Sequence, residues 1–155
     1  MKNDEKSSFE QLEYILKNSG YIINICEAEQ CGGTAWFESN YDIDINLFEK
    51  FKKDPEKIKD LIKEDRNLLI KDYKRTELYK VLNHWIGNNL IINAIFYDIK
   101  KILLNFNYNV YLYQDRLLKR DDIYSEIYDS TSLLSYVIIF ESNDSVVSMG
   151  MYWSD

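Results

Sequence analysis

The chain has 155 residues, of which 46% are hydrophobic, 29% charged and 15% aromatic, and its formal net charge at pH 7 is -7. This length suits one domain with a single hydrophobic core, and so many apolar residues beside one proline and five glycines exclude collagen-like and intrinsically disordered chains. The acidic balance also argues against a general binder of nucleic acids or anionic membranes, because both need a basic surface.

The start of the chain and its hydropathy predict a cytoplasmic protein. Residues 1–6 are too polar to open a signal peptide, and no run reaches the roughly 18 apolar residues that a membrane-spanning helix needs. In a reducing compartment the two cysteines, Cys26 and Cys31, are expected to remain thiols.

The first third of the chain predicts a helix followed by a β-hairpin. Alternative capping boxes open at Ser7 and Ser8, and Gly20 is expected to end the helix. Residues 21–28 and 34–39 alternate and are rich in β-forming side chains, with a glycine turn between them, so they predict an antiparallel hairpin. The apolar residues that share one face of the helix are Phe9, Leu12 and Leu16.

The middle of the chain predicts helices. A capping box at Asn46 opens a short helix, and Asp54-Pro55 opens a long one in which the apolar phase slips, so that a break is expected within residues 70–76. Gly87-Asn88-Asn89 ends that helix and caps the next. The three-four spacing of apolar residues from Ile92 to Phe106 makes this last helix the clearest in the chain.

After Asn107 the apolar period changes to two. Strands are predicted at 110–113 and 123–128, followed by a hairpin that pairs 136–141 with 145–153. The hairpin face expected to meet the core carries Tyr136, Ile138, Phe140, Val147, Met149 and Met151. We therefore predict a single α+β domain over residues 1–155, with an N-terminal helix and β-hairpin, central helices, and a C-terminal antiparallel β-meander packed against the helices.

The charge is distributed unevenly along the chain. The net charges of residues 1–17, 18–49, 50–120 and 121–155 are -1, -6, +7 and -7, and the second and fourth segments contain no lysine or arginine. The helical middle is therefore basic, whereas both predicted β regions are purely acidic.

The acidic β regions predict a partner-binding face. Within residues 123–128, strand alternation turns the two isoleucines one way and the Tyr-Glu-Tyr row the other way. Tyrosine is favoured at interface hot spots, and an acidic field speeds association with basic partners. The alternative is a solvated sheet face whose tyrosines only favour β structure. The residues of the predicted face are Asp121, Asp122, Tyr124, Glu126, Tyr128, Asp129, Glu141, Asp144, Glu38, Asp42 and Asp44.

No motif predicts catalysis, a bound metal or a cofactor. The single histidine, His84, stands near the end of a predicted helix without a nucleophile motif, so we expect it to interact with the helix dipole. Residues 42–46 begin like a calcium loop, but Leu47 replaces the required glycine and Lys53 the bidentate glutamate. The lysines of residues 50–80 alternate with acids at spacings that form intrahelical pairs, so direct binding of nucleic acid is not expected.

We therefore expect a small acidic protein, not an enzyme, that neutralises a basic protein partner by occluding it. In general character it looks like the immunity proteins that inhibit bacterial toxins such as nucleases, although no stretch carries the motif of a named family. Three alternatives stay open. They are a phage or mobile-element inhibitor of a host defence nuclease, of anti-restriction or anti-CRISPR type; an assembly subunit or homo-oligomer in which the basic helices of one copy meet the acidic sheet of another; and an enzyme with a carboxylate site around Glu38, Asp42 and Asp44.

Overall fold

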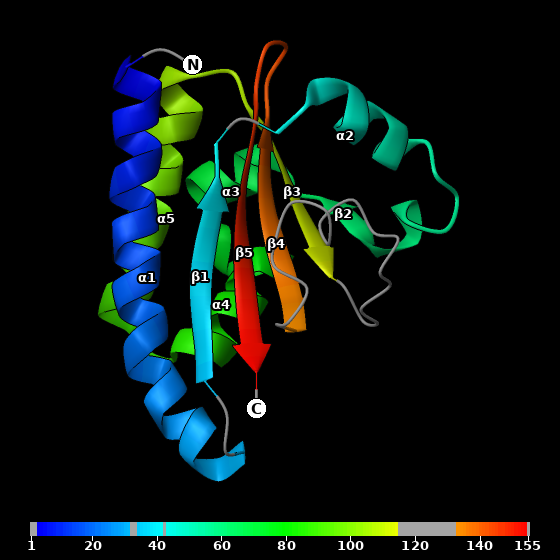
Figure 1. Cartoon of the computed structure of the whole chain (residues 1–155). Helices are drawn as coiled ribbons and strands as arrows, with labels where there is room; N and C mark the ends of the chain where they lie inside the picture. The colour runs from blue at the N-terminus through cyan, green and yellow to red at the C-terminus, as the bar shows by residue number, and fades with distance from the viewer. Residues whose placement is uncertain (1–2, 32–33, 42, 115–132, 155) are drawn as a thin grey trace.

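The computed structural model describes residues 3–31, 34–41, 43–114 and 133–154 (Figure 1). The helices are α1 (Asn3–Cys31), α2 (Ile45–Lys52), α3 (Arg66–Lys71), α4 (Glu77–Ile86) and α5 (Asn89–Asn105), with short 3-10 turns η1 (Ile58–Asp60) and η2 (Tyr73–Arg75). The strands are β1 (Thr34–Asn40), β2 (Leu61–Lys63), β3 (Asn109–Gln114), β4 (Leu133–Glu141) and β5 (Val146–Ser154). None of the helices in these ranges is both long and apolar enough to cross a bilayer.

The five strands form one antiparallel sheet in the order β1-β5-β4-β3-β2. β5 lies between β1 and β4, so the last strand of the described chain joins the first strand to the rest of the sheet (Figure 1). An N-terminal helix, central helices and C-terminal antiparallel strands that pack against helices confirm the predicted α+β fold class.

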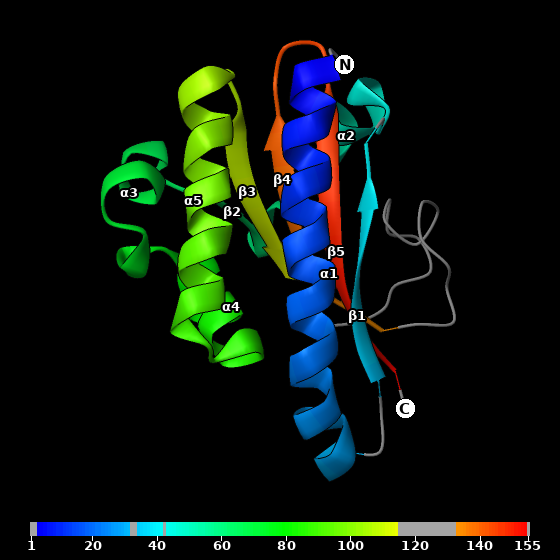
Figure 2. The same ribbon diagram turned by 90° about the vertical axis from the view of Figure 1, so that its left-hand side faces the viewer.

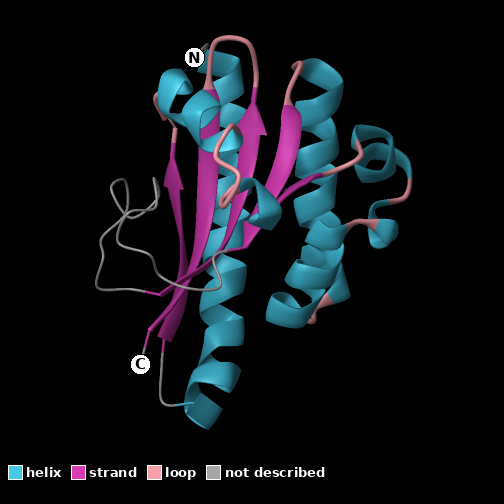
Figure 3. Cartoon of the chain, turned by 90° about the vertical axis from the view of Figure 1, so that its right-hand side faces the viewer, coloured by secondary structure: helices cyan, strands magenta, loops and turns pink. Residues whose placement is uncertain are grey.

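Helices cover both faces of this sheet. Figure 2 shows α1, α4 and α5 on one side of the strands, and Figure 3 shows α2 on the other. The main core lies under α1, α4 and α5, and its strand residues include Val110, Leu112, Ile138, Phe140, Val147 and Met149. A second core lies under α2, and it consists of Ile43, Phe48, Phe51, Tyr111, Tyr113, Val137, Ile139 and Val146. Strand alternation therefore divides consecutive apolar residues between two cores.

The β4–β5 hairpin has the predicted register. Phe140 lies opposite Val147 and Ile138 opposite Met149, and all four side chains are buried in the main core. The amide of Ser142 donates to the carbonyl of Ser145 at 2.8 Å, which closes the turn as expected. Local alternation and one turn were sufficient to predict this part of the fold.

The predicted N-terminal hairpin is wrong. Residues 21–28 continue α1 through Gly20, and β1 pairs with β5 instead of with a neighbouring strand. Cys26 and Cys31 therefore both lie in α1 and do not flank a hairpin loop. A glycine inside a helix costs only about 1 kcal/mol relative to alanine, and the β preference of isoleucine and tyrosine depends on tertiary context, so neither signal stops the helix here.

The predicted long helix after Asp54-Pro55 is also wrong in its first part. η1 leads into β2, which pairs with β3 from Leu61 opposite Tyr113 to Lys63 opposite Tyr111. Short apolar runs fit a helix or a strand equally well, and here the unpaired edge of β3 offers partners to the backbone of β2. The expected break within residues 70–76 is confirmed, because α3 ends at Lys71 and α4 begins at Glu77.

The predicted helix caps are partly correct. Gly87 has a φ of 66°, in the left-handed region that glycine tolerates, and Asn88 accepts hydrogen bonds from the first amides of α5, as expected. The start of α2 differs from the predicted capping box at Asn46, because the Asp44 side chain caps the helix by accepting a hydrogen bond from the amide of Asn46. α1 begins at Asn3, so the serines predicted to cap it lie inside the helix.

One carboxylate is buried at the flank of α5. Asp98 is 3% exposed, and its Oδ2 has no hydrogen-bond partner, unlike the other buried side-chain polar atoms of the described residues. The ammonium of Lys101 lies 3.7 Å from Oδ1. Burial raises the pKa of the Asp98 carboxyl above its usual value of 3.8, although the nearby Lys101 acts in the opposite direction.

At pH 7 the free energy of unfolding of the Asp98→Asn variant is expected to exceed that of the wild type by about 1 kcal/mol. The variant should be more stable because it removes a buried charge with an unpaired oxygen. The pKa of Asp98 is higher in the folded protein than in the unfolded chain, so its protonation stabilises the fold as the pH falls through the folded-state pKa. The difference in stability between Asp98→Asn and the wild type should therefore shrink at low pH. Urea denaturation at several pH values measures this, with the exposed Asp72→Asn as control. A destabilised Asp98→Asn at neutral pH would contradict the interpretation.

Candidate functional site

The residues of the predicted partner-binding face fall into three groups. Seven of them lie outside the described residues: Asp42, Asp121, Asp122, Tyr124, Glu126, Tyr128 and Asp129. Glu38 lies in β1 opposite Gly150 of β5. The remaining three, Asp44, Glu141 and Asp144, are described with their side chains, and the structure gives each a different environment.

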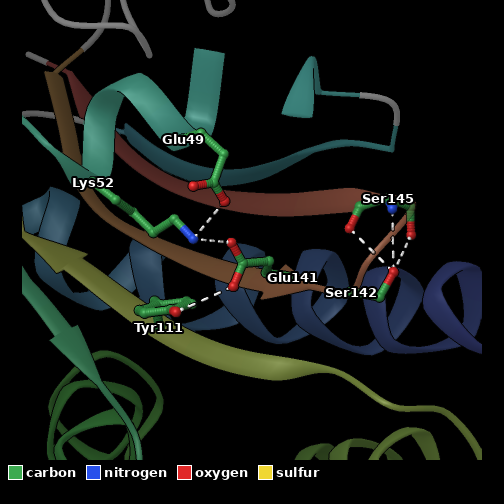
Figure 4. Close-up of polar contacts among 6 residues, drawn as sticks. All are labelled: Glu49, Lys52, Tyr111, Glu141, Ser142 and Ser145. Atoms are coloured by element: carbon green, nitrogen blue, oxygen red, sulfur yellow. Dashed lines mark hydrogen bonds and ion pairs between the residues drawn. The ribbon is translucent and has the colours of Figure 1, made fainter. Parts of the chain in front are cut away.

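Asp44 and Glu141 both have structural contacts on the α2 side of the sheet. The Asp44 carboxylate caps α2. Figure 4 shows the ammonium of Lys52 between the carboxylates of Glu49 and Glu141, with the Tyr111 hydroxyl pointing at Glu141. Lys52 lies 2.8 Å from Glu49, and Tyr111 donates to Glu141 Oε1 at 3.2 Å. Glu141 is thus a partnered residue beneath α2 and not a free acid on a surface.

The Lys52 ion pairs are partly shielded from water. The side chain of Lys52 is 23% exposed and that of Glu141 11%. Burial lowers the pKa of Lys52, but its hydrogen bonds with Glu141 and Glu49 raise it by more, so the net shift is upward. Lys52 therefore stays charged over the physiological range, and it neutralises one of the seven acids of the C-terminal segment.

Asp144 lies in a cleft at one end of the sheet. Figure 1 shows the start of α1, the β4–β5 turn and the connection from α5 to β3 gathered at this end. The cleft between them has a volume of about 550 Å³. We call it the acidic cleft; its lining residues are Asp4, Glu5, Asn105, Phe106, Asn107, Tyr108, Ser142, Asn143 and Asp144.

The lining of the acidic cleft combines charge with hydrogen-bonding groups. It holds three carboxylates and three side-chain amides, and no lysine or arginine is among its residues. Asp4, Asp144 and the asparagines are exposed, whereas Tyr108 is fully buried. Carboxylate and amide oxygens accept hydrogen bonds from ammonium and guanidinium groups, so the cleft is suited to cationic side chains.

Tyr108 connects the walls of the cleft. Its hydroxyl donates to Glu5 Oε2 at 2.7 Å and lies 3.0 Å from Ser145 Oγ, so it joins the first turn of α1 to the β4–β5 turn. Its ring packs edge-on against Phe9 and Phe140 in the main core. Burial and the hydrogen bond to Glu5 raise the pKa of Tyr108 to about 12, so the hydroxyl remains a neutral donor at physiological pH.

Arg66 fixes the third wall. Its guanidinium donates to the carbonyl of Leu103 at the end of α5 and to Asn107 Oδ1 at 3.0 Å. A cation at the C-terminus of a helix satisfies carbonyls that lack helical partners and interacts favourably with the helix dipole. This contact holds the end of α5 and the α5–β3 connection, which consists of Phe106, Asn107 and Tyr108, against the body of the protein.

Sequence reasoning missed most of the cleft. Asp4 and Glu5 precede the predicted start of the helix at Ser7 or Ser8, and nothing in the sequence indicates that they lie beside residues 105–108 and 142–144. The one usable signal was Asp144, which was placed on the predicted face because it lies in a purely acidic segment.

The other candidate chemical groups do not meet in the described part of the chain. His84 lies in the last turn of α4, near the helix end as predicted, and it is exposed. No three histidine, cysteine, aspartate or glutamate side chains of the described residues are arranged to hold a metal ion.

Comparison with models of protein families, with curated proteins and with solved structures gives no match for this chain. A function must therefore be argued from the chemistry of the site.

Replacing Lys52 by methionine is expected to lower the free energy of unfolding by about 2 kcal/mol, because Glu141 would keep a largely buried charge without its cation. The matched control is Lys50→Met on the exposed side of the same helix, which should change stability by less than about 0.5 kcal/mol. Adding Glu141→Gln to Lys52→Met should restore part of the loss. Equal effects of Lys52→Met and Lys50→Met in urea denaturation would show that the pair contributes nothing.

Proposed function

We propose that the protein is a small cytoplasmic inhibitor that binds a basic protein partner at the acidic cleft and occludes its active surface, as an immunity protein does against a toxin such as a nuclease. The observation that carries the proposal is the lining of the cleft, where three carboxylates and three amides converge without a lysine or arginine. The purely acidic composition of residues 121–155, to which Asp144 belongs, supports the same kind of partner.

The physical argument starts from the partner. A nuclease needs a positive cleft to bind phosphates, and a complementary negative surface both accelerates the encounter and blocks that cleft. Asp4 in α1 and Asp144 in the β4–β5 turn are both exposed and line the acidic cleft, so an arginine or lysine that enters it meets acceptors from two different elements. Occlusion of this kind needs charge and shape complementarity but no chemistry.

The walls of the cleft are held before a partner arrives. The hydrogen bond of Tyr108 with Glu5 and the contacts of Arg66 with the end of α5 are already formed in the free protein, so binding a partner does not have to order these side chains. A preformed surface loses less conformational entropy on binding, which favours the slow dissociation that an inhibitor requires.

The test uses the protein encoded immediately upstream, where the gene of a cognate toxin would stand. Replacing both Asp4 and Asp144 by lysine is expected to weaken the affinity of the toxin for this protein at least about a hundredfold, because charge pairs in the interface would become repulsive. The same change should reduce the salt dependence of binding. The variant should also fail to protect cells that express the toxin. Calorimetric titration at several salt concentrations measures the first effect.

Two further variants locate the binding face. Glu56→Lys together with Asp72→Lys makes the same charge change on exposed acids of the helical middle and should leave affinity nearly unchanged. Glu126→Lys together with Asp129→Lys tests the predicted face instead of the cleft. Loss of binding only in this last variant would move the site to residues 121–129. Unchanged binding in all three double variants, including the one at Asp4 and Asp144, would remove the acidic-surface hypothesis.

The phage alternative has its own test. If the gene lies among prophage genes and the protein inhibits a host defence nuclease, the phage alternative would be favoured.

A further inference from the structure

The outer surface of α5 carries an apolar stripe. Leu90, Tyr97 and Leu104 follow one another at intervals of seven residues and are 81%, 63% and 61% exposed. Intervals of seven keep residues on one side of a helix. The buried residues of α5, such as Ile92, Ile95, Ile99 and Ile102, lie on the opposite side, so the stripe points directly away from the main core.

The stripe exposes enough apolar surface to contribute to an interface. Its three side chains together expose on the order of 400 Å², which is comparable with the largest apolar patch of a typical soluble monomer. A standard interface buries roughly 800 Å² on each partner, so the stripe would supply about half of one. α1 lies beside α5 in the same layer (Figure 2), and its Tyr14 is also exposed, at 70%.

The spacing of the stripe makes it self-complementary. It reads the same in both directions from Tyr97, with one leucine seven residues on either side. Two copies of α5 can therefore meet about a two-fold axis at Tyr97, and each leucine then finds an apolar partner in the other copy.

The charges beside the stripe favour antiparallel over parallel packing of two α5 helices. Lys100 and Lys101 flank the C-terminal half, whereas Asn93 and Ala94 flank the N-terminal half. A parallel pair would bring the lysines of both copies together. An antiparallel pair places Lys101 opposite Asn93 and Lys100 opposite Ala94, and it also opposes the two helix dipoles. Lys101 is further accommodated by Asp98 at 3.7 Å and by the Tyr97 ring, 5.2 Å away.

We propose that the protein forms a two-fold homodimer in which the α5 helices pack antiparallel, with Leu90 of one copy against Leu104 of the other and the two Tyr97 rings at the axis. This interface is distinct from the acidic cleft and does not depend on the proposed function. It also differs from an assembly in which basic helices meet an acidic sheet, because its central contacts, through Leu90, Tyr97 and Leu104, are apolar.

Sedimentation velocity across the micromolar range tests the dimer. The wild type should show a concentration-dependent dimer, and Leu90→Glu should raise its dissociation constant about a hundredfold, because two-fold symmetry places the new charge in the interface twice. The matched control is Leu47→Glu, which is exposed on α2 on the other side of the sheet and should dimerise normally. Circular dichroism and urea denaturation verify that both variants fold. A monomeric wild type, or a dimer that salt dissociates and Leu90→Glu does not, would overturn the proposal.

Disulfide trapping tests the direction of the pair in a background with Cys26→Ser and Cys31→Ser. Tyr97→Cys should cross-link with itself, and a mixture of Leu90→Cys and Leu104→Cys should give a mixed dimer, whereas either of these alone should not cross-link. Self-linking of Leu90→Cys without the mixed product would show a parallel pair and would contradict the proposed geometry.

Discussion

The central strands bury apolar side chains on both faces, and this double burial determines where the helices lie. Ile138 and Phe140 of β4 enter the main core, whereas Val137 and Ile139 enter the core under α2. Because neither face can be left to water, α1, α4 and α5 cover one face and α2 covers the other. Beneath α2, the pairing of Lys52 with Glu141 then fixes that helix to the end of β4.

α5 takes part in the main core and in both of the surfaces for which we propose binding, the acidic cleft and the apolar stripe. Its inner side contributes to the main core, its C-terminal end forms a wall of the acidic cleft, and its outer side carries the apolar stripe. Asp98 lies between the inner and outer sides, beside Lys101, so a buried charge stands close to the proposed dimer contact. The cleft and the stripe still differ in chemistry, because one offers oxygen acceptors and the other apolar surface.

The parts of the fold that could be predicted are those with a local cause. The spacing from Ile92 to Phe106 and the alternation of β4 and β5 act between near neighbours in sequence, and both predictions are confirmed. The pairing of β1 with β5 and the path of α1 through Gly20 depend on tertiary contacts that no local pattern contains. The cleft was missed for the same reason, since the Tyr108–Glu5 hydrogen bond joins residues 103 positions apart. Of the predicted face, the structure places Asp144 in the cleft and gives Asp44 and Glu141 structural contacts.

The position of β5 between β1 and β4 has a consequence for synthesis on the ribosome. β1 emerges early but has no partner strand until β5 follows, more than 100 residues later. Long-range strand pairing of this kind is slow, and the waiting strand exposes a free edge in the meantime. Tyr108 likewise cannot be joined to Ser145 before the last hairpin is made. A nascent chain therefore has no complete cleft, and the binding that we propose there requires that translation has first delivered β5.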